Sequence, residues 1–191
     1  MNLPNRLTIL RLILTPIFLA LIVMDLKYSY LAALIVFVIA SLTDMVDGMV
    51  ARKNNLITDF GKFLDPLADK MLTTAAFLAF IKMNLGVGIV WITFIVLIRE
   101  FLITSLRLIS AGKGKVIAAN AWGKAKTISQ MVAIISVIFF EQIIKLFELP
   151  QMFKTVVMWG QSIVLWVSAV LTVISGIIYV IDNRKFIDPS K

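Results

Sequence analysis

Six long runs of apolar residues, separated by short polar or glycine- and proline-containing breaks, fill this sequence. Each run is close to the roughly 20 residues that a helix needs to cross the hydrocarbon core of a bilayer. Hydrophobic residues make up 60% of the 191 residues, and charged residues only 16%. We therefore expect an all-α integral membrane protein in which residues 1–191 form one domain, a six-transmembrane-helix bundle over residues 6–25, 30–53, 62–83, 87–110, 122–148 and 153–183.

The first run follows basic residues and so imitates a secretory signal peptide. It has no small-residue cleavage site of the A-x-A type, and further apolar runs follow it. We expect this segment to be retained as the first helix of the bundle.

Loop charge predicts the orientation of the bundle. If the N-terminus is cytoplasmic, the cytoplasmic side collects most of the Lys and Arg residues: Arg6, Arg11, Arg52, Lys53, Lys62, Lys70, Arg107, Lys113, Lys115, Lys124, Lys126, Arg184, Lys185 and Lys191. The other side keeps Lys27, Lys82, Lys145 and Lys154, and Arg99 lies within a helix. Under the positive-inside rule both termini are then cytoplasmic. This rule also accounts for the net charge of +8, and since no basic stripe is interleaved with aromatics, we expect no nucleic-acid partner.

Cysteine and histidine are both absent from the sequence. Their absence excludes Ser-His-Asp hydrolysis, zinc proteases of the HExxH type and haem ligation by histidine. Acid–base chemistry must therefore use carboxylates, lysines, tyrosines or water, and any metal must be held by oxygen ligands.

Aspartates gather in one stretch of this apolar chain. Asp44 and Asp47 are three residues apart on the second expected helix, and Asp65 and Asp69 are four apart on the third, so each pair shares a helical face. A link of a few residues makes these helices antiparallel neighbours, which brings four carboxylates to one point on the cytoplasmic side. A carboxylate near mid-membrane costs about 2.5–3.5 kcal/mol on insertion scales, so we expect a compensating positive charge among them.

An all-oxygen ligand set suits Mg²⁺, Mn²⁺ or Ca²⁺, and four carboxylates suffice to bridge two such ions. A two-metal site of this kind can clamp the attacking and leaving oxygens of a phosphoryl displacement. Small residues beside the aspartates would let a ligand approach closely, and an arginine fork suits phosphate; these are Gly48, Ala51, Gly61 and Arg52. The alternative is that the carboxylates face cytoplasmic water or pair with Lys53, Lys62 and Lys70.

The pattern Asp44-x-x-Asp47-Gly48-x-x-Ala51-Arg52, then eight residues, then Gly61-x-x-x-Asp65-x-x-x-Asp69, resembles the signature of the CDP-alcohol phosphatidyltransferase family at every fixed position. The resemblance implies that an alcohol hydroxyl attacks the β-phosphorus of a CDP-linked lipid and that CMP leaves. It implies that the four aspartates hold two Mg²⁺ or Mn²⁺ ions and that Asp69 is the catalytic base. The CDP-lipid site implied by the same likeness comprises Asp44, Asp47, Gly48, Ala51, Arg52 and Gly61, and Asn5 either approaches the nucleotide or anchors the first helix.

The acceptor alcohol is suggested by cations near the ends of the fourth and fifth helices. An acceptor with its own phosphate would need such groups, and we assign Arg107, Lys126 and Lys124 to that phosphate. Lys113 and Lys115 are better explained by the positive-inside rule. The segments NLPNRLTILRLILTP, IREFLITSLR and WGKAKT resemble the bacterial subgroup of the family that joins CDP-diacylglycerol to glycerol 3-phosphate. Arg99 and Glu100 within the second of these either tie the fourth helix to the bundle or contact substrate.

Two further readings stay open within the family, a cardiolipin synthase and an enzyme that uses inositol phosphate. A divalent-cation transporter is the alternative of a different class, but it would need carboxylates near the midplane and a path on both sides of the membrane. The family likeness implies a homodimer in the bacterial cytoplasmic membrane, although no Gly-x-x-x-Gly pair occurs in the chain.

Overall fold

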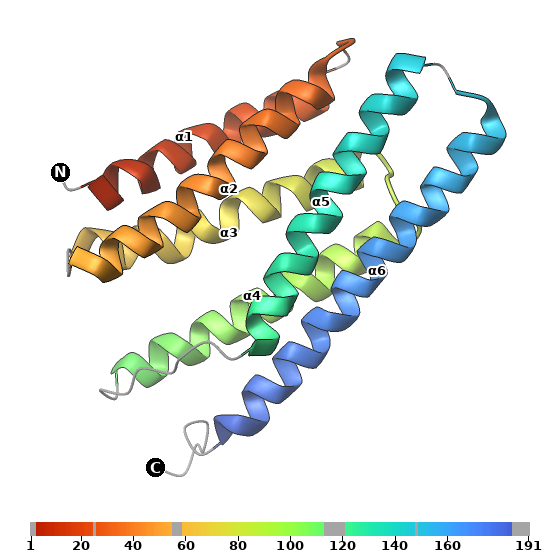
Figure 1. Ribbon diagram of the computed structural model, residues 1–191. Coiled ribbons are helices and arrows are strands. Elements are labelled where there is room, and N and C mark those ends of the chain that lie inside the picture. The colour runs from red at the N-terminus through yellow and green to blue at the C-terminus, as the bar shows by residue number, and fades with distance from the viewer. Residues whose placement is uncertain (1–2, 25, 55–58, 113–120, 148, 185–191) are drawn as a thin grey trace.

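The computed structural model describes residues 3–24, 26–54, 59–112, 121–147 and 149–184 (Figure 1). Within these ranges the side chains of residues 3–4, 45–54, 59–66, 69 and 111–112 are not described. The described chain forms six α-helices, and every one begins and ends within three residues of its expected range. The helices are α1 (Leu3–Val23), α2 (Ser29–Asn54), α3 (Asp59–Lys82), α4 (Ile89–Gly112), α5 (Ala121–Phe147) and α6 (Gln151–Asp182).

The helices pack as two connected groups (Figure 1). In the first, α1 lies against both α2 and α3, and α2 also contacts α3. In the second, α6 lies against both α4 and α5, while α2 with α5 and α3 with α4 join the groups. Successive helices alternate in direction. One end of the bundle therefore contains the starts of α1, α3 and α5 and the ends of α2, α4 and α6. We call it the aspartate end, since α2 and α3 carry the four aspartates there.

The core combines large apolar side chains with small alanines. Phe18 of α1 and Phe37 of α2 are fully buried, with ring centroids 5.4 Å apart. Buried alanines let the neighbouring helices approach closely, among them Ala33 and Ala40 on α2, and Ala68, Ala75, Ala76 and Ala79 on α3. Such close approach gives the packing contacts that hold helices together in lipid, where no hydrophobic effect draws them to each other.

Large apolar side chains also cover the outside of the helices, for example Ile13, Ile35, Ile98, Ile128 and Ile177, each 48–65% exposed. An apolar surface of this extent is typical of a protein that faces lipid rather than water. Within the described residues, four helices are long and apolar enough to cross a membrane: Asn5–Val23, Ile89–Ser110, Ala121–Phe147 and Gln151–Asp182. Ser29–Asp44 is a shorter apolar stretch. The protein is therefore a membrane protein whose described residues fold into helices without strands.

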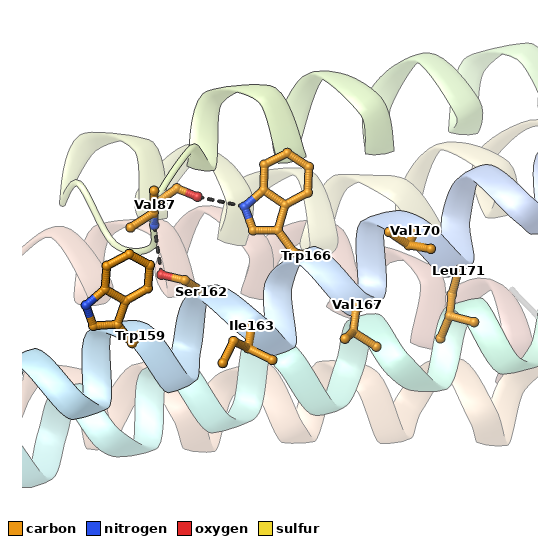
Figure 2. A pocket seen from close by; sticks show the side chains of 8 residues that line it. All are labelled: Val87, Trp159, Ser162, Ile163, Trp166, Val167, Val170 and Leu171. Atoms are coloured by element: carbon orange, nitrogen blue, oxygen red, sulfur yellow. Dashed lines mark hydrogen bonds between the residues drawn. The ribbon is translucent and has the colours of Figure 1, made fainter.

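Hydrogen bonds fix the loops at the end of the bundle opposite the aspartate end. Gln142 of α5 accepts a hydrogen bond from the Leu31 backbone N–H at 2.8 Å and donates one to the Lys27 carbonyl at 3.0 Å, which holds the start of α2. Figure 2 shows the corresponding contacts on α6. Ser162 Oγ accepts from the Val87 N–H, and Trp166 Nε1 donates to the Val87 carbonyl, both at 2.9 Å.

Glycine is required in the loop between α3 and α4. Gly86 has a φ of +87°, and a Cβ placed on it would lie 2.7 Å from Leu165 Cδ1. Any other residue would meet both backbone strain and a clash with α6. The close approach of this loop to α6 therefore depends on that glycine, and an apolar groove of about 440 Å³ lies beside it, lined by Val87 and seven residues of α6 (Figure 2).

Candidate active site

A stripe of buried polar residues follows one face of α1. Asn5, Thr8, Arg11 and Thr15 are separated by three, three and four residues, the spacing of a single helical face, and none is more than 8% exposed. A buried polar face on a helix in lipid must face other polar groups within the protein. The structure thus shows that α1 contributes to a polar interior as well as crossing the apolar region.

Arg11 reaches the first residue of the aspartate signature. Its Nη1 lies 2.6 Å from Asp44 Oδ1 on α2, and the arginine side chain is 2% exposed while that of Asp44 is 41% exposed. In the sequence, Arg11 is only one of the expected cytoplasmic cations. In the structure this guanidinium supplies the compensating positive charge expected beside Asp44, and it fixes the direction of that carboxylate.

The remaining signature residues lie on helices whose backbone is described. Asp47, Gly48, Ala51 and Arg52 lie on α2, and Gly61, Asp65 and Asp69 on α3, but their side chains fall outside the described residues. Among the side chains that are described, no three potential metal ligands cluster. Asp44 is the one aspartate of the signature whose side chain is described. Its carboxylate is partly exposed and held by Arg11, and a carboxylate oxygen is a suitable ligand for a hard cation. The two-metal site remains a prediction.

A second charged cluster joins three helices around Glu100 of α4. Its Oε1 contacts Lys126 Nζ of α5 and lies 3.2 Å from Arg99 Nη1, and its Oε2 lies 3.9 Å from Lys70 Nζ of α3. The side chain of Glu100 is 15% exposed and that of Lys126 is 6% exposed. We call these four residues the Glu100 cluster. Lys70 directly follows Asp69, so the cluster lies beside the aspartates of α3 along the chain.

Arg99 extends the cluster to a fourth helix. Its Nη2 donates to Ser175 Oγ of α6 at 2.8 Å, and a Cβ on Gly176 would lie 3.1 Å from Arg99 Cγ, so α6 is shaped to receive the arginine. Of the two roles that the sequence left open for Arg99 and Glu100, the structure shows that they tie α4 to the bundle. Contact with substrate stays untested.

The three residues assigned to the acceptor phosphate have different surroundings. Lys126 is buried in the Glu100 cluster. Arg107 is largely exposed, and its Nε donates to Tyr179 Oη of α6 at 3.4 Å with the guanidinium 5.6 Å from the ring centroid. Lys124 is exposed on the first turn of α5. The structure places all three at the aspartate end but does not bring them into one contact.

One residue at this end, Arg11, does not stand out as a functional candidate in the sequence, although the polar spacing of α1 is a readable signal for it. Glu100 does stand out as a charge within a helix, but its partners do not. The pairs Arg11–Asp44 and Lys126–Glu100 join residues 33 and 26 positions apart, so only the packing of the helices reveals them.

Comparison with known proteins supports a function for this arrangement. The family model described as CDP-alcohol phosphatidyltransferase matches residues 1–174. A Bacillus subtilis protein named CDP-diacylglycerol–glycerol-3-phosphate 3-phosphatidyltransferase is 40% identical over 170 residues, covering 83% of this chain and 86% of the relative. Proteins of the same name from Pseudomonas fluorescens and Escherichia coli K12 are 36% and 37% identical, covering 71% and 70% of this chain and 71% and 74% of their own lengths.

Proposed function

This chain belongs to the CDP-alcohol phosphatidyltransferase family, and we propose that within the family it is a phosphatidylglycerophosphate synthase. It transfers the phosphatidyl group of CDP-diacylglycerol to glycerol 3-phosphate and releases CMP. The observation that carries this assignment is the likeness, at 36–40% identity over most of the chain, to several proteins named for that reaction. The complete aspartate signature agrees with it.

In the proposed reaction, the glycerol 3-phosphate hydroxyl oxygen forms a bond to the β-phosphorus of CDP-diacylglycerol as the bond from that phosphorus to CMP breaks. Asp69 takes the hydroxyl proton, and CMP leaves with the electron pair. No covalent enzyme intermediate is needed, which agrees with a chain that lacks cysteine and histidine. The protein's main tasks are then to position two substrates and to offset the charge of the diphosphate.

Asp44, Asp47, Asp65 and Asp69 are the residues that would hold Mg²⁺ or Mn²⁺, which when bound neutralises charge on the diphosphate and on the departing CMP. Arg11 holds Asp44 in place for this role through the ion pair at 2.6 Å. Gly48, Ala51 and Gly61 leave space for the nucleotide, Arg52 binds its phosphates, and Asn5 approaches it from α1. Arg107, Lys126 and Lys124 bind the phosphate of the acceptor.

We propose further that all six helices cross the bacterial cytoplasmic membrane, with the termini and the aspartate end on the cytoplasmic side, and that the enzyme is a homodimer. The distribution of Lys and Arg supports this orientation. It places the site where both a membrane-embedded donor and a water-soluble acceptor can reach it. A reporter that is active only outside the cytoplasm, fused to the C-terminus, should stay inactive, and its activity would contradict the orientation.

One assay tests the activity. Purified protein in detergent or vesicles is given CDP-diacylglycerol, Mg²⁺ or Mn²⁺, and one of four acceptors: glycerol 3-phosphate, phosphatidylglycerol, inositol phosphate or glycerol. We expect CMP release with glycerol 3-phosphate. Release with phosphatidylglycerol or inositol phosphate alone would instead show a cardiolipin synthase or an inositol-phosphate-using enzyme, and no release with any acceptor would exclude the proposed reaction.

A further inference from the structure

The Glu100 cluster places one carboxylate among three cations that come from α3, α4 and α5. None of these four side chains is more than 23% exposed. A buried cation in lipid is unfavourable unless an anion lies beside it, and one cation left without that anion would also repel its neighbours. Glu100 therefore offsets the charges of Lys70 and Lys126 and draws both lysines toward its carboxylate.

The three cations are held in different ways. Arg99 is attached to α6 by its hydrogen bond to Ser175 and by the space that Gly176 leaves for its side chain. Lys126 extends from α5 and contacts Oε1, while Lys70 approaches Oε2 from α3. Losing the Glu100 charge would thus leave Arg99 attached to α6, whereas Lys70 and Lys126 would each lose their ion pair with Glu100.

The position of the cluster gives those lysines a use. Lys70 directly follows Asp69, the proposed base, so the cluster begins one residue from the group that must meet the acceptor hydroxyl. The four side chains together carry a net charge of +2. A phosphate monoester carries about −1.5 to −2 at pH 7, so its charge matches theirs, whereas a neutral alcohol or a phosphodiester with one charge does not.

We propose that Glu100 is a positioning residue for acceptor recognition: it holds Lys126 and Lys70 where they bind the phosphate monoester of the acceptor. This role rests on the proposed function, and it adds Lys70 to the residues assigned to the acceptor. Glu100 itself does not touch the substrate. It acts through the lysines, so its removal lowers the affinity for the acceptor rather than the affinity for the CDP-lipid.

The first test is Glu100→Gln, which keeps the shape of the side chain and removes its charge. We expect KM for glycerol 3-phosphate to rise roughly ten- to hundredfold, the loss that corresponds to one charge-assisted contact. KM for CDP-diacylglycerol should stay within about twofold of wild type, because the CDP site lies on the aspartates. Glu141→Gln is the matched control, since Glu141 is a half-buried carboxylate near the opposite end of α5 that accepts a hydrogen bond from Gln161 at 2.8 Å. It should leave both KM values unchanged.

Variants that already lack both lysines separate this role from a purely structural one. If Glu100 acts through Lys70 and Lys126, KM for glycerol 3-phosphate in Glu100→Gln/Lys70→Gln/Lys126→Gln should equal that of Lys70→Gln/Lys126→Gln, because both lysines are already lost. If the KM increases caused by the Glu100 substitution and by the lysine substitutions multiply, the proposal is overturned. An unchanged KM in a folded Glu100→Gln protein would also overturn it. If Glu100→Gln does not fold, Glu100→Asp serves instead: its shorter carboxylate should raise KM for the acceptor by less than Glu100→Gln would, and no rise would again overturn it.

The same assay distinguishes failure of the proposed function from failure of the role of Glu100. Wild-type protein that releases no CMP with glycerol 3-phosphate contradicts the proposed function, and the role of Glu100 falls with it. Wild-type protein that is active with glycerol 3-phosphate, but whose acceptor KM does not respond to Glu100 variants, contradicts only the role of Glu100.

Discussion

Arg11→Met offers a direct measure of the ion pair that holds the aspartate signature in place. The substitution removes a guanidinium that is 2% exposed and 2.6 Å from Asp44, and it fills part of the vacated space with an apolar chain of similar length. Removing one partner of a fully buried pair costs about 3–5 kcal/mol. Asp44 is 41% exposed, so water compensates part of the loss, and we expect about 1–2 kcal/mol of destabilisation.

For a chain of this size, that loss corresponds to a Tm lower by about 2–8 °C. Tryptophan fluorescence can follow the thermal unfolding in detergent, because the chain has 4 tryptophans. Arg6→Met is the matched control, since Arg6 lies on the same helix and is exposed, and it should change stability by less than about 0.5 kcal/mol.

A double variant tests whether loss of the ion pair between Arg11 and Asp44 causes the lower stability. If it is, Arg11→Met/Asp44→Asn should be no less stable than the less stable single variant, because both substitutions remove the same contact. Strictly additive losses, or a Tm of Arg11→Met equal to that of the Arg6 control, would refute the reasoning.

Three further predictions concern catalysis and the loop opposite the site. Asp69→Asn should lower CMP release by about 10²–10⁴-fold, the usual contribution of a general base, while CDP-diacylglycerol binding by isothermal titration largely survives; full activity would remove Asp69 as the base. Chelation with EDTA should abolish CMP release and added Mg²⁺ or Mn²⁺ should restore it, whereas activity that persists in EDTA would contradict the metal site. Gly86→Ala should lower stability by about 1–2 kcal/mol, because of its φ of +87° and the clash with Leu165. The matched Gly160→Ala meets no atom within 4 Å and should be neutral or stabilising; equal melting temperatures for the two variants would argue against the clash.

The bounds of the helices could be predicted because each apolar run ends at a polar or glycine-containing break. The spacing of the aspartates predicts that each pair shares one helical face, because a face repeats every three to four residues, and the structure is helical at both pairs. Their metal chemistry stays a prediction. Both signals are local, and neither depends on how the helices cross. The aspartate signature is also local, and it led to the same family that the comparisons show.

The partners of the charged residues could not be predicted, since they depend on helix crossings. Arg11 looked like one of many cytoplasmic cations, and only the packing of α1 against α2 brings it to Asp44. Lys126 is an acceptor candidate in the sequence because it lies near the start of a helix, yet its burial and its contact with Glu100 follow from the way α4 and α5 both pack against α6. The sequence offered several cations to pair with Glu100 and nothing to choose among them.

The two ends of the bundle are held together by different kinds of contact. Neutral hydrogen bonds from Gln142, Ser162 and Trp166 close the end opposite the aspartates, whereas ion pairs around Asp44 and Glu100 connect the helices nearer the aspartate end. Salt and charged ligands weaken or replace ion pairs but leave neutral hydrogen bonds almost unchanged. We therefore expect the helices to separate slightly at the charged end as each anionic substrate enters and each product leaves. The hydrogen-bonded loops at the opposite end would serve as the fixed point of that movement.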